Sequence, residues 1–301
     1  MIRIGVDFGG TKIEAAALSA DGQFKARVRK PNPGDYQGAL DTVREVVDEA
    51  EKQAGVGKLT VGVGVPGSLS PKTGRMRNAN SVWLNGKPFQ EDLEKALGRA
   101  LRLENDANCF ALSEALSGAA KGADVVFGAI LGTGCGGGVV VRGKTIEGIN
   151  KIGGEWGHSP LPWPSAEERA AHTCWCGRSN CLETWTSGTA FCEDYERATG
   201  AKLTGDVIME RARGGEAAAK DAFDRYCDRL GRALAVICDI LDPDAIVFGG
   251  GMSNTDELYE RVPPIVARHA FTDVFVTPIR KAEFGDSSGV RGAAWLWPLE
   301  T

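Results

Sequence analysis

Hydrophobic positions along the chain fall into short continuous runs and into longer stretches with helical spacing. Residues 2–6 and 13–18 are strand-like runs separated by a glycine turn, so they predict a β-hairpin, with a third strand over 24–28. Apolar side chains then recur at helical spacing over 40–54, which predicts an amphipathic helix that ends at Gly55.

The same succession of strand, glycine turn and strand returns further along the chain. Residues 124–131 predict a strand, 132–138 a glycine turn and 139–141 the returning strand. Because the pattern occurs twice, we expect two related domains. Further strands are expected at 59–65, 100–103 and 245–248, and further helices at 88–97, 109–120, 187–199, 206–211, 217–241 and 289–297. This alternation favours an α/β architecture in which the last helix packs back across the first domain.

The composition is that of a folded globular protein. The 301 residues are 43% hydrophobic and 25% charged, which is too apolar for a disordered chain. The length fits two domains of roughly 150 residues each. With 35 Lys and Arg against 40 Asp and Glu, the net charge is −5, which argues against a nucleic acid or an anionic membrane as a partner.

The N-terminal residues do not read as a signal peptide, because glycines and Asp7 interrupt them before an apolar segment develops. An apolar run of about 18 residues, as a membrane span needs, is absent because glycines divide the best candidate, residues 127–141. The eight cysteines are therefore expected as buried thiols or metal ligands rather than as disulfides. We expect a cytoplasmic protein.

The two glycine turns are candidates for binding phosphate. The first contains Gly9, Gly10, Thr11 and Lys12, and the second contains Gly132, Thr133 and Gly134. Glycine lets backbone N–H groups approach an anion closely, while threonine hydroxyls and a lysine add donors and charge. Asp7, before the first turn, suits a Mg²⁺ ion held through water beside the phosphate. Either turn alone reads equally well as a plain hairpin, but the pair favours phosphate binding.

Two widespread nucleotide-binding motifs do not apply. Gly132, Gly134 and Gly137 match G-x-G-x-x-G, but a valine run follows where the dinucleotide motif requires a helix. A Walker A sequence does not occur. The sequence therefore excludes a Rossmann dehydrogenase and a P-loop protein.

Polar residues 104–108 follow a predicted strand and precede an apolar helix. Asp106 there is either a simple helix N-cap or a base that accepts a proton from a substrate hydroxyl, with Asn105 holding a neighbouring hydroxyl. Ligands of α/β proteins usually bind at strand ends, which favours the second interpretation.

His158 and three nearby cysteines have the composition of a structural zinc site. Cys174, Cys176 and Cys181 supply three thiolates and His158 an imidazole, a set suited to tetrahedral zinc with no open position. His172 is a rival fourth ligand, and a buried or redox-active cysteine cluster is the alternative. The segment between His158 and Cys174 reads as a proline-rich turn followed by a charged surface stretch, either a solvated loop or a segment with a role in sugar selection.

Together these motifs resemble the ROK family (repressors, open reading frames and sugar kinases). The resembling positions run from end to end: 7–12, 64–67, 104–108, 132–134, 154–158, Cys174, Cys176, Cys181, Glu183 and 249–251. The resemblance implies an α/β protein with the actin-like ATPase (sugar kinase) fold, in which two duplicated RNase H-like lobes flank a central cleft. The expected small lobe comprises 1–111 and 287–301, and the large lobe comprises 112–286.

The resemblance also implies where ligands bind. ATP would lie between the lobes, its phosphates against both glycine turns with Mg²⁺ near Asp7, and its adenosine near Gly249, Gly250 and Gly251. Asp106 would be the general base that takes the proton from the sugar hydroxyl on C6. The other hydroxyls would be held by Asn80, Asn105, Glu155, His158 and Glu183. His158 would bind zinc through one ring nitrogen and face the sugar with the other.

Within the family, segments 66–71, 78–86 and 286–297 are most similar to those of bacterial fructokinases (mannofructokinases). We therefore expect ATP-dependent phosphorylation of fructose, with mannose also accepted, by a homodimer. N-acetylglucosamine kinase and glucokinase are the alternatives within the family. A non-catalytic sugar sensor is disfavoured because Asp106 and the first glycine turn are intact, and a repressor because no DNA-binding segment precedes the first strand.

Overall fold

The computed structural model describes residues 2–169 and 172–298, which divide into two compact units. Unit 1 comprises Met1–Gly122, Gly138–Gly154 and Glu283–Thr301, and unit 2 comprises Ala123–Gly137 and Glu155–Ala282. This division differs from the lobes expected from the sequence, because 112–122, 138–154 and 283–286 join the first unit. The reason is local packing, since the helix after Asn105 lies against the C-terminal helix over much of its length.

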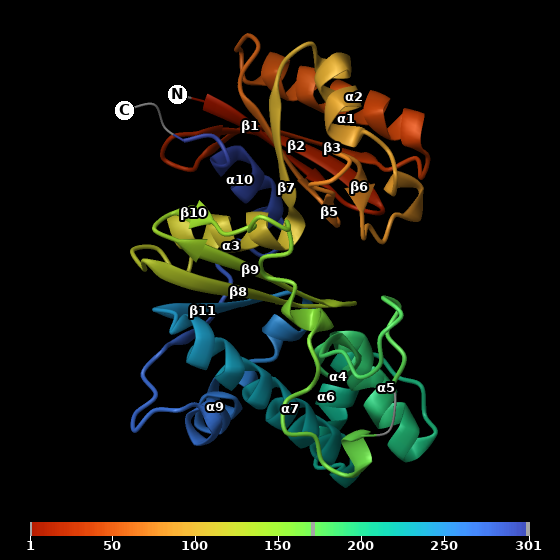
Figure 1. Ribbon diagram of the computed structural model, residues 1–301, viewed down its shortest axis with the longest axis vertical. Coiled ribbons are helices and arrows are strands. Elements are labelled where there is room, and N and C mark those ends of the chain that lie inside the picture. The colour runs from red at the N-terminus through yellow and green to blue at the C-terminus, as the bar shows by residue number, and fades with distance from the viewer. Residues whose placement is uncertain (1, 170–171, 299–301) are drawn as a thin grey trace. The chain divides into compact units, whose positions relative to one another are not determined.

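Unit 1 is built on a five-stranded sheet with the order β3-β2-β1-β4-β7 (Figure 1). Its strands are β1 (Ile2–Phe8), β2 (Lys12–Ser19), β3 (Phe24–Pro31), β4 (Val61–Val65) and β7 (Leu101–Asn105). The first three form an antiparallel meander, whereas β4 and β7 run parallel to β1. The carboxyl ends of β1, β4 and β7 therefore meet at one edge, where Asp7 and Asn105 lie.

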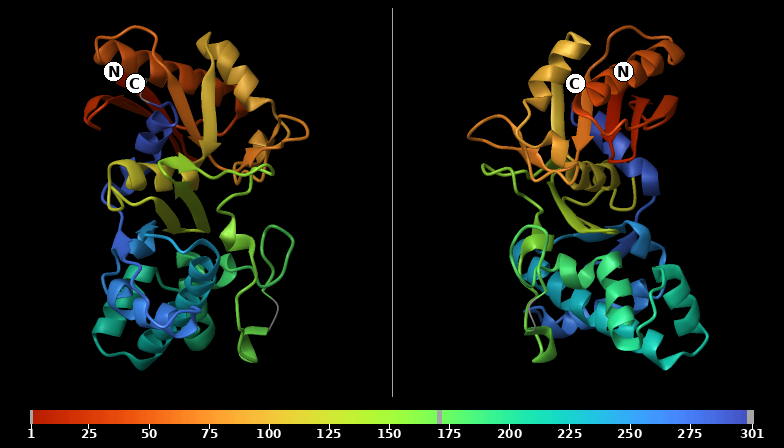
Figure 2. Two further views of the ribbon diagram at one scale, coloured as in Figure 1. Left: turned by 60° about the vertical axis from the view of Figure 1, so that its left-hand side comes forward. Right: turned by 90° about the vertical axis from the view of Figure 1, so that its right-hand side faces the viewer.

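Helices cover both faces of this sheet, as the views in Figure 2 show. The helices of unit 1 are α1 (Tyr36–Gln53), α2 (Phe89–Leu97), α3 (Asp106–Leu116) and α10 (Ser288–Trp295). Ile4 and Val6 point to the α1 side and join its apolar face in the buried core. Side chains alternate along a strand, so Gly5 faces α10, where a Cβ would lie only 2.0 Å from the carbonyl oxygen of Val290. The last helix packs against the first domain, as predicted.

Smaller elements of unit 1 surround the strand ends. They are β5 (Ser68–Leu69), β6 (Met76–Arg77), the 3₁₀ turn η1 (Val82–Leu84) and β10 (Lys144–Thr145), which pairs with the preceding strand β9 (Cys135–Val141). The sequence analysis placed the start of that strand at 139, but it begins at Cys135, so the last three glycines of the run belong to the strand. One of them, Gly138, lies against the backbone of Ala107, where a Cβ would be 2.4 Å from the carbonyl oxygen.

The second sheet has the order β10-β9-β8-β11-β12, and the division between the units falls inside β9. In unit 2, β8 (Val125–Leu131), β11 (Ala245–Gly249) and β12 (Ile279–Lys281) are parallel. Its helices are α4 (Glu183–Thr186), α5 (Gly188–Thr199), α6 (Gly205–Arg213), α7 (Ala217–Leu241), α8 (Leu258–Arg261) and α9 (Pro263–His269), with turns η2 (Trp156–His158), η3 (Glu167–Arg169) and η4 (Gly251–Asn254). Among the described residues, no helix combines the length and apolarity needed to cross a membrane.

The segment before the cysteine cluster is exposed at Glu167 and Arg169, as expected of a charged, solvated stretch, but Glu168 anchors it through buried ion pairs. Glu168 is buried and accepts from Arg229 Nε at 2.7 Å and from Arg232 Nη2 at 2.8 Å. Arg232 also donates to the carbonyl oxygens of Pro162 and Trp163, at 2.7 and 2.9 Å. Both arginines belong to α7, so this helix anchors the segment at Pro162, Trp163 and Glu168.

Candidate functional site

The first glycine turn joins β1 to β2 and is closed by backbone hydrogen bonds. The N–H of Gly9 donates to the carbonyl of Lys12 at 2.9 Å, and Asn32 Nδ2 donates to the carbonyl of Gly9 at 2.8 Å. Gly10 and Thr11 are exposed at the tip, where the Thr11 carbonyl accepts from the N–H of Asn32 at 2.9 Å. Asn32 was missed in the sequence analysis because its link to the turn joins positions 23 apart.

Asp7 lies at the end of β1, immediately before this turn. Burial, reinforced by the nearby carboxylate of Glu14, raises the pKa of Asp7 to about 6, although Lys12 opposes the shift. The Lys12 ammonium is 3.8 Å from Asp286. Asp7 is half-buried and the exposed carboxylate of Asp286 is close enough to act on it, and such oxygen donors fit a Mg²⁺ ion held through water.

Asp106 is the first residue of α3, and the residue that caps this helix is its neighbour. Asn105 Oδ1 accepts from the N–H of Ala107 at 2.9 Å, so Asn105, not Asp106, is the N-cap. The Nδ2 group of Asn105 donates to the carbonyl of Gly67 at 3.2 Å, which ties the cap to the end of β4. Asp106 is exposed on the first helical turn, where the helix dipole stabilises a carboxylate. The structure thus presents a carboxylate on a rigid support.

Asn80 lies in a loop that is held rigidly against the first sheet. Asn85 binds the backbone of Ala79 twice, accepting from its N–H at 2.9 Å and donating to its carbonyl at 3.0 Å. The ring of Trp83 contacts Phe8 edge-on, with the centroids 6.0 Å apart. The Asn80 side chain is exposed on this fixed loop, so it is available to a polar ligand.

The second glycine turn lies in unit 2, where it meets the other predicted nucleotide segment. The N–H of Gly188, at the start of α5, donates to the carbonyl of Gly132 at 2.7 Å, and Thr189 Oγ1 donates to the carbonyl of Thr133 at 2.9 Å. Gly250 packs on the same turn, since its Cβ position would lie 2.9 Å from the nitrogen of Gly132. The structure therefore brings residues 132–134 and 249–251 together within one unit.

Glu183 is bound to this second turn and to the cysteine-rich loop. Its Oε2 accepts from the N–H of Cys135 at 3.0 Å, and its Oε1 accepts from Trp175 Nε1 at 2.6 Å. A Cβ at Gly134 would lie 2.5 Å from Glu183 Oε2, so the absence of a side chain at Gly134 makes this contact possible. Trp175 was missed because its role depends on a carboxylate supplied by another element.

The predicted metal ligands converge. The ligand atoms of His158, Cys174, Cys176 and Cys181 all lie within 4.8 Å of one another. His158 Nδ1 is 3.6 Å from Cys174 Sγ, and Cys176 Sγ is 3.6 Å from Cys181 Sγ. A tetrahedral zinc ion with Zn–S bonds of about 2.3 Å would place its sulfur ligands about 3.7 Å apart, so the cluster fits zinc.

The crowding of the thiols in this cluster also favours a bound cation. Burial, together with the neighbouring thiols, raises the pKa of Cys181 to about 12. Thiolates packed so closely repel one another unless a cation lies among them. His172 is not in the cluster, because its ring packs edge-on against Trp185 with the centroids 4.3 Å apart. The histidine nitrogen that faces the thiols is Nδ1, which leaves Nε2 of His158 for another partner.

Glu155 is linked to this metal-binding segment through the backbone. It precedes η2, and the N–H of His158 donates to its carbonyl at 3.2 Å. The exposed Glu155 side chain and the half-buried His158 ring therefore belong to one tight turn.

The predicted residues thus form two sets, each within one unit. Unit 1 holds Asp7, Gly9, Gly10, Thr11, Lys12, Asn80, Asn105 and Asp106, and unit 2 holds Gly132, Thr133, Gly134, Glu155, His158, Cys174, Cys176, Cys181, Glu183, Gly249, Gly250 and Gly251.

Comparisons with known proteins agree on the family. Residues 3–300 match the ROK family. The chain is 41% identical over 297 residues to N-acetyl-D-glucosamine kinase from Vibrio cholerae, covering 97% of this chain and 98% of that protein.

Two solved structures have the same fold. The ROK hexokinase from Thermus thermophilus superimposes with a TM-score of 0.88 at 30% identity, over 98% of this chain and 97% of that one. A ROK family glucokinase from Streptomyces griseus, solved with glucose and AMPPNP, gives a TM-score of 0.79 at 28% identity and covers 98% of both chains. With the duplicated sheets and converging motifs described above, these likenesses show that the chain belongs to the ROK family and has its actin-like sugar kinase fold.

Proposed function

We propose that this protein is a kinase that transfers the γ-phosphoryl group of ATP to the C6 hydroxyl of a hexose. The observation that carries the proposal is the carboxylate of Asp106, exposed on the first turn of α3 and supported by the Asn105 cap. A carboxylate in this position can accept the proton of a sugar hydroxyl as that oxygen attacks phosphorus. The Gly67 carbonyl holds Asn105, which leaves one Nδ2 hydrogen for a neighbouring sugar hydroxyl.

The glycine turns account for phosphate binding. Bound Mg-ATP supplies the phosphoryl group, and the cation neutralises charge on the transferred phosphate. The exposed first turn offers backbone N–H groups and the Thr11 hydroxyl, and Lys12 adds a positive charge. Asp7 is the residue proposed to hold Mg²⁺ through water. In unit 2 the turn at 132–134 and the loop at 249–251 offer uncharged donors for the nucleotide.

Residues of unit 2 are proposed to hold the other sugar hydroxyls. Glu183 and Glu155 accept hydrogen bonds from hydroxyls, and His158 presents Nε2 to the sugar while Nδ1 binds zinc. With four protein ligands the zinc has no open position for water, so its role is to fix the His158 ring. The fold-level likeness is shared by enzymes of several sugars, so the substrate depends on these side chains and on Asn80.

Two sugars have separate support as the substrate. The relative from Vibrio cholerae, 41% identical over nearly the whole chain, is named an N-acetyl-D-glucosamine kinase. That name supports the alternative raised in the sequence analysis rather than its first choice, fructose. Fructose, with mannose, keeps the support of segments 66–71, 78–86 and 286–297, which include the rigid loop carrying Asn80.

A coupled assay of ADP release tests the proposal. The protein is incubated with Mg-ATP and, in separate reactions at equal concentration, N-acetylglucosamine, fructose, mannose or glucose. Sugar-dependent ADP release supports the kinase, and the sugar with the highest kcat/KM identifies the substrate. Release of ADP at the same rate with and without every sugar would contradict the proposal, because phosphoryl transfer would then not require the hydroxyl that Asp106 is placed to deprotonate.

A further inference from the structure

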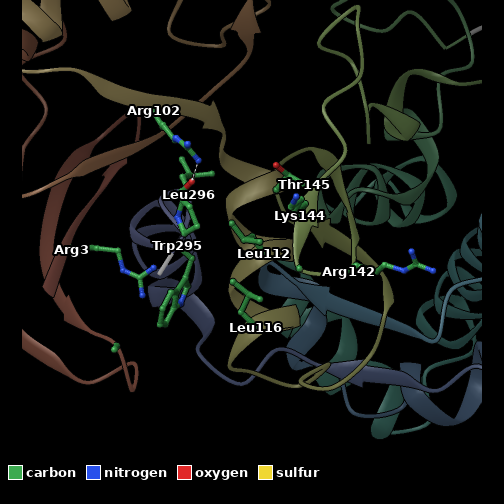
Figure 3. A pocket seen from close by; sticks show the side chains of 12 residues that line it. Arg3, Arg102, Leu112, Leu116, Arg142, Lys144, Thr145, Trp295 and Leu296 are labelled. Carbon is green, nitrogen blue, oxygen red and sulfur yellow. Dashed lines mark hydrogen bonds between the residues drawn. The ribbon is translucent and has the colours of Figure 1, made fainter. Parts of the chain in front are cut away.

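A cavity of about 730 Å³ lies within unit 1, away from the glycine turn and Asp106 (Figure 3). It is bounded by the N-terminal parts of β1 and β7, the C-terminal half of α3, the end of α10 and the turn between β9 and β10. Arg3 is four residues before Asp7 on β1, so the cavity and the phosphate turn are about 13 Å apart along that strand. A cavity of this volume accommodates a small metabolite.

The wall of the cavity contains a buried arginine, Arg3, that has no carboxylate partner among residues 2–169 and 172–298. Arg3 is 1% exposed, and its Nε and Nη2 atoms are buried without a hydrogen-bond partner among the described residues. Its third nitrogen, Nη1, donates to the carbonyl of Trp297 at 2.6 Å, and its guanidinium carbon is 4.1 Å from the Trp295 ring centre. Burial lowers the pKa of Arg3. Unpaired buried N–H groups on a cation cost free energy unless a ligand compensates them.

Two further cations line the same cavity at more accessible positions. Arg102 and Lys144 are exposed, and Arg102 Nη1 donates to the carbonyl of Leu296 at 2.5 Å. Arg142 also belongs to the lining, but its guanidinium points away from the other side chains in Figure 3. None of the described residues that line the cavity is an Asp or Glu.

The rest of the lining is apolar. Leu112 and Leu116 of α3 lie opposite the indole of Trp295 (Figure 3). An aromatic ring and two leucines beside three cations match a ligand that has an anionic group and a less polar body.

We propose that this cavity is a binding site for a small phosphorylated metabolite. Its phosphate would accept hydrogen bonds from Arg102 and Lys144, while Arg3 supplies the uncompensated positive charge in the wall behind them. The body of the ligand would pack between Trp295 and the leucines of α3. The site is separate from the glycine turn of unit 1, so the inference does not depend on the proposed kinase activity.

Arg3, Arg102 and Lys144 have no described carboxylate beside them in the cavity lining, so the cavity suits an anion better than a neutral molecule. The Arg229 and Arg232 side chains of unit 2 are also buried, but Glu168 neutralises both at hydrogen-bond distance. Among the described residues, two of the three buried arginines thus have a carboxylate partner, and Arg3, which faces the cavity, is the exception. A phosphate monoester supplies the missing negative charge and several acceptor oxygens.

Isothermal titration calorimetry of the whole protein with glucose 6-phosphate or inorganic phosphate tests this inference. The titrations are run with Mg-AMPPNP saturating and with a saturating hexose substrate, so that other phosphate- and sugar-binding positions are filled. The expected result is one binding event for either probe at millimolar concentration or below. Binding of glucose 6-phosphate alone identifies the body of the ligand as necessary, and binding of both identifies a general phosphate site; either supports the inference.

Amino-acid substitutions show whether the measured binding occurs in this cavity. We expect the Arg102→Gln/Lys144→Gln double variant to bind the probe at least about tenfold more weakly, because it loses two charge-assisted contacts. Arg142→Gln removes the same charge from a side chain that points away and should bind like the unmodified protein. Arg3→Gln should also bind more weakly, but the exposed pair keeps the test valid if that variant does not fold. No binding of either probe, or equal binding by the double variant, would overturn the inference.

Discussion

The β1–β2 and β8–β9 turns occupy equivalent places in two sheets of similar order, but the residues around them differ in charge. The first turn is flanked by Asp7 and Lys12, with Asp286 near the lysine. The second turn has no ionisable residue within it and is held by backbone contacts to Gly188 and Gly250. The carboxylate of Glu183 lies beside this turn and accepts hydrogen bonds from Cys135 and Trp175.

This difference indicates a division of tasks between duplicated units. Unit 1 contains the ionisable groups beside its turn, Asp7 and Lys12, and the carboxylate of Asp106. Under the proposed function, unit 2 would supply uncharged donors for the nucleotide and a set of sugar ligands held in place by the metal. Phosphoryl transfer requires both charge neutralisation and positioning, and each can be tested separately by substitution in one unit.

The largest effect is expected from Asp106→Asn, which removes the proposed base without changing its size. We expect kcat to fall by about a thousandfold, since general base catalysis contributes on the order of 10²–10⁴. Binding of AMPPNP, measured by calorimetry, should stay within about twofold, because the phosphate turns are unchanged. Asp48→Asn, an exposed change on α1, is the control. A fully active Asp106→Asn protein would show that another group accepts the proton.

Asp7 should make the stability of the metal-free protein depend on pH. Its pKa is about 6 when folded, against 3.8 in the unfolded chain, so the folded state binds the extra proton between these values. Stability contributed by the protonated form is therefore present below pH 3.8 and is lost as the pH rises through about 6. The loss amounts to about 2–3 kcal/mol, at 1.36 kcal/mol per pKa unit.

Urea unfolding at several pH values, without Mg²⁺ or nucleotide, measures this dependence. Comparison with Asp7→Asn isolates the contribution of this residue, since the variant lacks the titrating carboxyl. An identical change of unfolding free energy between pH 4 and pH 6 in both proteins would show that Asp7 is not responsible.

Cys176→Ser tests whether zinc holds His158 in place for sugar binding. Loss of one thiolate should release zinc and free the His158 ring, so we expect the KM for sugar to rise about ten- to a hundredfold. The KM for ATP should change much less, because the nucleotide segments do not include the cluster. Metal analysis and steady-state kinetics measure the two effects, with Cys192→Ser as the control for a cysteine outside the cluster. Wild-type protein without stoichiometric zinc would contradict this interpretation.

The smallest effects are expected from one substitution in each glycine turn, and these two substitutions compare the turns directly. Lys12→Gln removes a charge from the first turn and should raise the KM for ATP about tenfold, the effect of one lost charge-assisted contact. Thr133→Val removes only a neutral hydroxyl from the second turn and should raise it about two- to fivefold. Equal effects of the two substitutions would argue against the division of charge between the turns.

Features that depend on local sequence were predictable here. The helix over 217–241 has the bounds that its apolar spacing predicted, and both hairpins follow from strand-like runs around glycines. The convergence of the proposed metal ligands was also predictable, because three of them lie within eight residues, and the structure places His158 rather than His172 beside them.

Features that depend on partners far apart in sequence were not predictable. Glu168 looked solvated, but its partners Arg229 and Arg232 lie more than 60 residues away on α7. The start of β9 was misplaced because its glycines are typical of a turn, whereas one of them, Gly138, allows close packing on α3. The burial of Arg3 was likewise not predictable, because the ring that covers it, Trp295, belongs to the C-terminal helix at the other end of the sequence.

The most direct test of the central claim is to observe the transferred phosphate. Phosphorus NMR of the protein with Mg-ATP and an equal mixture of N-acetylglucosamine and fructose follows every phosphorylated product at once. We expect a phosphate monoester on C6 of one sugar to grow as the γ-phosphate signal of ATP decays, and the same mixture with Asp106→Asn protein to remain almost unchanged. Decay of ATP to free inorganic phosphate alone, or equal product from both proteins, would contradict a hexose kinase that uses Asp106 as its base.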